Sequence, residues 1–100
     1  MKTSLDLEIF SSHQLNELCE KYHIDQIALF GSFAKGLATP DSDVDLLVQF
    51  RQPISLFTFV KVEDEFAELL GKPVDLVTKG GLSPYLKDEI LSSSKVVYEV

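Results

Sequence analysis

The sequence predicts an α/β protein of the α+β type, with a small mixed β-sheet of about four strands and helices packed mainly on one face. Three observations support this prediction. Short apolar runs alternate with segments of helical periodicity along the chain. Apolar residues make up 45% and charged residues 25% of the composition, which is ordinary for a globular protein. A length of 100 residues, with no linker and no internal repeat, favours one domain over 1–100.

The N-terminal half is expected to alternate between helical and extended segments. Leu15, Leu18 and Tyr22 recur at helical spacing, and Ser12 before them is a candidate N-cap. A short apolar run then ends at Gly31, as buried strands often do. The elements expected here are a helix over 12–23, a strand over 26–30, one or two helical turns over 32–35 and a strand over 43–50.

The C-terminal half repeats this alternation. Gly71 is placed to end a long helix, and Pro84 to occupy the first turn of another. The elements expected here are a helix over 55–70, a strand over 73–78, a helix over 84–91 and a strand over 95–100. The long helix has more apolar residues than one core stripe needs, and Phe57 and Phe59 suit either a partner interface or deeper burial. Its solvated face is expected to comprise Glu63, Asp64, Glu65 and Glu68.

Charge and cysteine content exclude several classes of function. With 9 basic and 16 acidic residues the formal charge is −7, which disfavours binding to duplex nucleic acid or to anionic membranes and suits a basic protein partner. Cys19 is the single cysteine, so an intrachain disulfide is impossible. No apolar run approaches the length of a membrane span, and a cytoplasmic location is expected.

Two aspartates share one face of the predicted strand over 43–50. Side chains alternate between faces along a strand, so Asp43 and Asp45 point one way while Val44 and Leu46 point into the core. Neighbouring carboxylates repel each other, and a divalent cation removes that penalty. If the strand over 73–78 lies beside this one, Asp75 joins the pair, and three carboxylates can hold two Mg²⁺ ions.

A phosphate-binding turn is predicted just upstream of these aspartates. The strand over 26–30 runs into Gly31 and Ser32, where a helix is expected to begin. Unpaired N–H groups at a helix N-terminus attract phosphate. Gly31 allows close backbone approach, Ser32 offers a hydroxyl, and Lys35 adds positive charge one turn later.

Ten residues separate Ser32 from Asp43, and this spacing carries a family resemblance. Gly-Ser-Phe-Ala-Lys-Gly over 31–36, Ser-Asp-Val-Asp-Leu-Leu-Val over 42–48 and Val-Asp-Leu-Val over 74–77 resemble the motifs of the DNA polymerase β-like nucleotidyltransferases, and most closely the minimal nucleotidyltransferases. The resemblance extends over essentially the whole chain. One departure is Lys35, where the family usually has Arg, so the planar guanidinium fork is lost there.

This resemblance implies a specific activity. Minimal nucleotidyltransferases of this size resemble the antitoxins that pair with HEPN-domain ribonuclease toxins, and the implied reaction transfers AMP from ATP to a tyrosine hydroxyl of the toxin. Asp43 and Asp45 would hold both Mg²⁺ ions, Asp75 would complete one metal site and assist deprotonation of the acceptor, and Gly31 and Ser32 would bind the triphosphate. A chain of 100 residues has little room for an acceptor pocket, which agrees with an acceptor on another protein.

Two other functions remain open from the sequence. The chain is alternatively a catalytically silent module that neutralises the toxin by covering it, although the complete set of three aspartates favours the enzyme. An antibiotic-modifying nucleotidyltransferase ranks last, because such enzymes carry an additional helical domain for the acceptor. The sequence does not fix the nucleotide base, the number of AMP groups added, or whether the chain also forms a homodimer.

Overall fold

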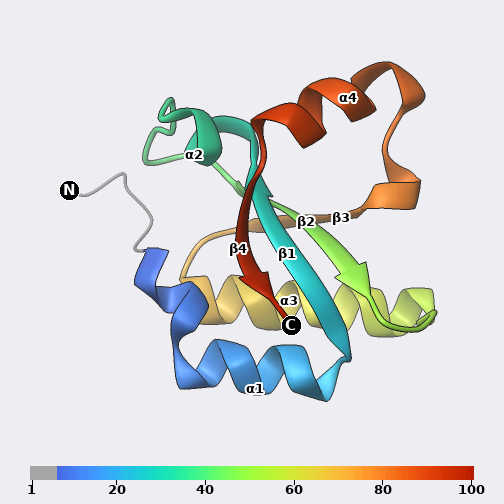
Figure 1. The fold of residues 1–100 in the computed structure, drawn as a ribbon. Coiled ribbons are helices and arrows are strands. Elements are labelled where there is room, and N and C mark those ends of the chain that lie inside the picture. The colour runs from blue at the N-terminus through green and yellow to red at the C-terminus, as the bar shows by residue number, and fades with distance from the viewer. Residues whose placement is uncertain (1–6) are drawn as a thin grey trace.

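The computed structural model describes residues 7–100, which form a four-stranded sheet with four α-helices and two 3-10 helices (Figure 1). In order, the elements are η1 (Leu7–Ser11), α1 (His13–Lys21), β1 (Ile24–Phe30), α2 (Gly31–Lys35), β2 (Val44–Phe50), α3 (Leu56–Leu70), β3 (Val74–Thr78), η2 (Lys79–Gly81), α4 (Pro84–Ser93) and β4 (Lys95–Glu99). The predicted mixed α/β fold with about four strands is confirmed.

The sheet has the strand order β3-β2-β1-β4. β1 is antiparallel to both β2 and β4, whereas β2 and β3 are parallel and are joined through α3. Two parallel strands need a long crossover connection, because the chain must return to the end of the sheet at which the first strand began. The strands that carry Asp45 and Asp75 are therefore neighbours, which is the condition under which Asp75 joins the other aspartates, and β3 lies at one edge of the sheet.

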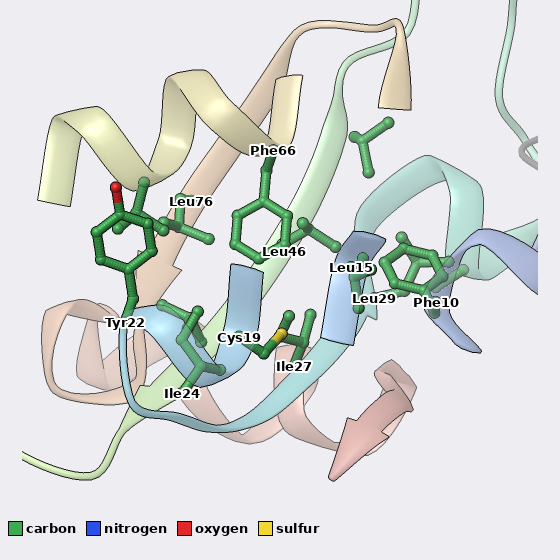
Figure 2. Close-up of a cluster of buried hydrophobic side chains, with 14 residues drawn as sticks. Phe10, Leu15, Cys19, Tyr22, Ile24, Ile27, Leu29, Leu46, Phe66 and Leu76 are labelled. Carbon is green, nitrogen blue, oxygen red and sulfur yellow. The ribbon is translucent and has the colours of Figure 1, made fainter. Parts of the chain in front are cut away.

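The main core lies between the sheet and two helices, α1 and α3, which run along the same face (Figure 1). Figure 2 shows Leu15 and Cys19 of α1 and Phe66 of α3 gathered with Ile27 and Leu46 of the sheet, all of them buried. By contrast, α4 contributes no buried residue. Helices therefore pack mainly on one face of the sheet, as the sequence predicts.

The predicted helix ends are largely confirmed. The Ser12 side chain accepts a hydrogen bond from the N–H of Leu15, Gly71 ends α3 with left-handed backbone, and Pro84 opens α4. The first helix is shorter than predicted, because it ends at Lys21 and His23 adopts left-handed backbone with φ 56°. The two 3-10 helices, η1 and η2, were not predicted, since such short turns lack a hydrophobic period.

The apolar excess of α3 divides between burial and exposure. Phe59 is half-buried and its ring meets that of Phe50 edge-on, with centroids 6.3 Å apart. Phe57 is 84% exposed, and Leu56 and Val60 are exposed beside it. The deeper burial considered from the sequence therefore applies to Phe59 and not to Phe57.

The predicted solvated acidic face of α3 is wrong for two of its four acids. Glu63 accepts a hydrogen bond from the backbone N–H of Leu76 in β3, at 2.9 Å. Glu65 accepts a hydrogen bond from the Tyr22 hydroxyl at the end of α1. The sequence shows which helix carries these carboxylates, but not that α1 and β3 approach it on either side of the core stripe.

Within residues 7–100, no helix is both long and apolar enough to cross a membrane. Cys19 is a buried free thiol in α1. Burial raises the pKa of this thiol to about 12, so it is protonated at neutral pH and acts as a packing residue.

Candidate active site

Two of the three predicted carboxylates lie side by side on neighbouring strands. In the parallel pairing of β2 with β3, Asp45 is the direct register partner of Asp75. Paired residues on adjacent strands project from the same face, and neighbouring strands are about 4.8 Å apart. Val44 and Leu46, on either side of Asp45, are buried in the core. The predicted alternation along β2, with apolar residues inward and acids outward, is therefore present at this point.

Asp43 lies one residue before β2 and is exposed. The predicted strand began at Asp43, but β2 begins at Val44, whose N–H donates to the carbonyl of Pro73 at 2.9 Å. Asp43 nevertheless acts on the same site, because its charge contributes to the pKa shift of Asp45. Asp43 thus directly precedes β2, on the solvent-exposed side of the Asp45 and Asp75 pair.

The electrostatics of the site centre on Asp45. Burial raises the pKa of its carboxyl above the ordinary value of 3.8, and the neighbouring charges of Asp75 and then Asp43 raise it further. Both causes disfavour the ionised form of Asp45 in the metal-free protein. A divalent cation would reverse the balance, since it supplies the positive charge that the three carboxylates lack.

Gly31 brings the backbone at the end of β1 against this cluster. Phe30 is the register partner of Asp45 across β1 and β2, and Gly31 follows with φ 72°. A Cβ atom built on Gly31 would overlap Oδ2 of Asp45 and lie 3.0 Å from its Cγ. The glycine is required twice here, for its left-handed backbone and for the absence of a side chain beside the carboxylate.

Ser32 and Lys35 extend the site along α2. Ser32 is half-buried in the first turn, and no side chain caps the start of this helix, where Phe30 is the N-cap. Lys35 is exposed in the last turn, and among residues 7–100 it makes no ion pair with any of the three aspartates. The structure therefore brings Gly31 against Asp45, places Ser32 next to Gly31 in the first turn of α2, and forms no ion pair between Lys35 and the aspartates within residues 7–100.

The donor set suits Mg²⁺ in its chemistry, since carboxylate oxygens are the hard ligands that this ion prefers. Within the described part of the chain, no group of three or more His, Cys, Asp or Glu is already drawn together as a metal cage. Asp43 and Asp75 do act on the charge of Asp45. The arrangement is thus a set of neighbouring carboxylates that repel one another.

A groove of about 770 Å³ lies elsewhere in the described chain. It lies at the carboxyl ends of β2 and β3 and is lined mainly by apolar side chains, including Phe50, Leu56 and Phe59. Asp45 and Asp75 occupy the opposite, amino-terminal ends of the same two strands. The chemistry of the carboxylates, and not the presence of a groove, identifies the candidate active site.

Sequence comparison places this geometry in a family. Residues 12–97 match the model of the nucleotidyltransferase domain. A Methanocaldococcus jannaschii protein whose name classes it with the protein adenylyltransferases is 41% identical over 92 residues, covering 90% of this chain and 93% of that protein. Protein adenylyltransferase MntA of Thermococcus cleftensis is 38% identical over 98 residues, covering 98% of this chain and 97% of that protein.

Solved structures agree with this assignment. A minimal nucleotidyltransferase superposes with a TM-score of 0.73 at 33% identity, over 93% of this chain and 97% of that one. A toxin–antitoxin crystallised with AMP-PNP gives 0.73 at 22% identity, over 87% of this chain and 72% of that one. The MNT antitoxin bound to the tri-AMPylated Shewanella oneidensis HEPN toxin gives 0.68 at 18% identity, over 95% of this chain and 74% of that one, a likeness of fold. The prediction of a nucleotidyltransferase is confirmed, and the chain belongs to the nucleotidyltransferase domain family.

Proposed function

We propose that this protein is a Mg²⁺-dependent protein adenylyltransferase that acts as an antitoxin. It transfers AMP from ATP to a tyrosine hydroxyl of a cognate HEPN toxin and so neutralises it. The observation that carries the proposal is the in-register pair of Asp45 and Asp75, with Asp43 at its margin and the Gly31 backbone against it. A site built for stability alone would not place like charges directly opposite each other on neighbouring strands.

The relatives support the reaction and the partner. The Thermococcus cleftensis relative is named a protein adenylyltransferase, and it matches this chain over nearly its full length. Structural neighbours include a toxin–antitoxin with AMP-PNP and an MNT antitoxin in complex with an AMPylated HEPN toxin. A triphosphate nucleotide and a helical protein acceptor are therefore the substrates that we assign to this chain. The cytoplasmic location and the single domain over 1–100 stay predictions.

The three aspartates would hold the metal ions. Asp43 and Asp45 would bind both Mg²⁺ ions and Asp75 would bind one, and bound Mg²⁺ supplies charge neutralisation for the triphosphate and lowers the pKa of the acceptor hydroxyl. Because Asp45 is the carboxylate whose ionised form is disfavoured, its proton competes directly with the cation. Metal affinity is therefore expected to fall as the pH falls toward the raised pKa of Asp45.

The chain's own residues then align the reaction. Gly31 has no side chain, so the backbone that leads into α2 lies directly against the Asp45 carboxylate. Ser32, the next residue, offers its hydroxyl and backbone N–H to phosphate oxygens. Asp75 is exposed, so its carboxylate is accessible to the tyrosine hydroxyl of a docked protein. Its role is to hold the proton that leaves the tyrosine oxygen. That oxygen forms a bond to the α-phosphorus, and the bond from this phosphorus to pyrophosphate breaks.

The test is the intact mass of the purified HEPN partner after incubation with this protein, ATP and Mg²⁺. We expect the mass to rise by one or more AMP units. The paired variant Asp43→Asn with Asp45→Asn keeps the shape of both side chains and removes both charges, and we expect no mass gain with it. A stable complex without any mass gain from the unaltered protein would instead support a catalytically silent binding module.

A further inference from the structure

Strand β3 is the short edge strand that carries Asp75, and only one of its sides is paired with the sheet. The N–H of Val44 donates to the carbonyl of Pro73 at 2.9 Å, which sets the alternation of this parallel ladder. Asp75 therefore directs its backbone groups toward β2, and Leu76 directs its N–H away from the sheet. An edge N–H of this kind has no strand partner and needs another acceptor.

A carboxylate from α3 meets that need. Oε2 of Glu63 accepts the hydrogen bond from the N–H of Leu76 at 2.9 Å. Glu63 is half-buried, and the Leu76 side chain is 4% exposed in the core. The peptide group between Asp75 and Leu76 is thus fixed by the core side chain of Leu76 and by an ionised acceptor, which makes a stronger bond than a neutral one.

We propose that Glu63 is a positioning residue for Asp75. It holds the peptide unit that follows Asp75, and so fixes the exposed carboxylate in register with Asp45 on β2. This inference rests on the proposed function in one respect, namely that Asp75 is a metal ligand. Residues that orient metal ligands through hydrogen bonds commonly influence metal affinity by tenfold or more.

The other acids of α3 show that this contact is specific. Glu65 accepts a hydrogen bond from Tyr22 and ties α3 to α1, on the far side of the helix from β3. Asp64 is exposed. Among the hydrogen bonds of residues 7–100, Glu63 is the side chain that joins α3 to the backbone of β3. The chain therefore offers matched controls on the same helix.

The experiment uses the full chain in four variants. Glu63→Ala removes the acceptor, and Glu63→Gln retains an acceptor oxygen of the same reach. Asp64→Ala removes an exposed charge from the neighbouring position, and Tyr22→Phe removes a structural hydrogen bond that does not touch β3. Two quantities are measured: hydrogen exchange of the Leu76 amide in metal-free protein, and Mg²⁺ affinity from titration of the Asp75 and Leu76 amide resonances.

We expect Glu63→Ala to accelerate exchange of the Leu76 amide and to weaken Mg²⁺ binding about tenfold. Glu63→Gln should leave both close to those of the unaltered protein, because an acceptor oxygen for the Leu76 N–H is retained. Asp64→Ala should leave both unchanged, and Tyr22→Phe should lower the unfolding midpoint while the Mg²⁺ affinity stays the same. Because Glu63→Gln keeps the hydrogen bond, it supplies a folded comparison if Glu63→Ala is unstable.

Three outcomes would overturn the inference. The first is an unchanged rate of hydrogen exchange at the Leu76 amide in Glu63→Ala, which would mean that the hydrogen bond to Glu63 does not form. The second is a lost contact with unaltered Mg²⁺ affinity, and the third is an equal loss of affinity in Tyr22→Phe. Failure of the proposed function is recognised separately, because the unaltered protein would then bind no Mg²⁺ at the Asp75 resonance although the Leu76 amide stayed protected.

Discussion

Gly31→Ala tests whether the backbone between β1 and α2 forms a wall of the active site, and Gly36→Ala is its matched control. The two glycines have nearly the same backbone, with φ 72° at Gly31 and 73° at Gly36. They differ in their surroundings. A Cβ atom at Gly31 would overlap Oδ2 of Asp45 and lie 3.2 Å from its Cβ, whereas a Cβ atom at Gly36 would meet nothing within 4 Å.

The expected magnitudes follow from this difference. A residue with a side chain in the left-handed region costs about 1–2 kcal/mol, and this cost applies to both variants. Gly31→Ala must also displace a side chain in a packed environment, which typically costs a further ~1–3 kcal/mol. We therefore expect Gly36→Ala to lower the free energy of unfolding by about 1–2 kcal/mol, and Gly31→Ala to lower it by about 2–5 kcal/mol.

The rate of AMP transfer should differ between Gly31→Ala and Gly36→Ala more than the free energy of unfolding does. A displacement of a catalytic group by about 1 Å can lower the rate about 100-fold. Gly31→Ala moves the Asp45 carboxylate, so we expect a loss of AMP transfer of this order, while Gly36→Ala retains activity. Urea denaturation measures the free energies of unfolding, and intact mass of the HEPN partner over time measures AMP transfer.

Equal effects of the two substitutions would contradict a specific role for the contact between Gly31 and Asp45. If both variants lost the same stability and the same activity, the backbone conformation alone would explain the glycine at 31, and the contact with Asp45 would be irrelevant. If Gly31→Ala lost stability and kept its activity, the carboxylate could move without consequence, and Asp45 would not be the metal ligand that we propose.

Three further predictions concern charge and core. The pKa of Asp45 is raised in the folded protein, so ionisation of this carboxyl opposes folding, and the stability of the metal-free protein should fall as the pH rises above 3.8. Asp45→Asn should therefore raise the melting temperature, measured by calorimetry, at pH 7 but not near pH 3. Tyr22→Phe should lower the free energy of unfolding by about 1 kcal/mol at pH 7. The Tyr22 hydrogen bond lowers the pKa of Glu65, so this difference should disappear as the pH falls through that pKa, and a difference independent of pH would contradict it. In urea denaturation, Phe66→Ala should cost about 3–5 kcal/mol, whereas Phe57→Ala, at 84% exposed, should change stability by less than ~0.5 kcal/mol.

Much of the fold could be predicted because its signals are local. Ser12 and Gly71 mark helix ends through the chemistry of their own side chains and backbone. The helix between the two apolar strands that carry Asp45 and Asp75 permits a parallel pair, but the sequence leaves open whether these strands are neighbours, and the structure shows that they are. The end of α1 could not be predicted in this way, because nothing in the sequence shows that His23 adopts left-handed backbone.

The contacts within the site needed three-dimensional information. Gly31 is recognisable as a glycine at a strand end, but its contact with Asp45 depends on the register of β1 against β2, which the sequence does not specify. The role of Glu63 was hidden for a similar reason. It lies between the core face and the solvent face of its helix, so helical periodicity alone assigned it to solvent, whereas β3 approaches closely enough to use it.

One helix accounts for most of the geometry of the proposed site. As the connection between β2 and β3, α3 allows those strands to run parallel, and the register of their pairing places Asp45 opposite Asp75. Its buried stripe, which includes Phe66, fixes the helix against the sheet. Its Glu63 holds the unpaired side of β3. A chain of 100 residues can therefore bring the three aspartates to one strand–helix–strand unit, and the loss of Glu63 from α3 should weaken metal binding although Glu63 is not one of the proposed ligands.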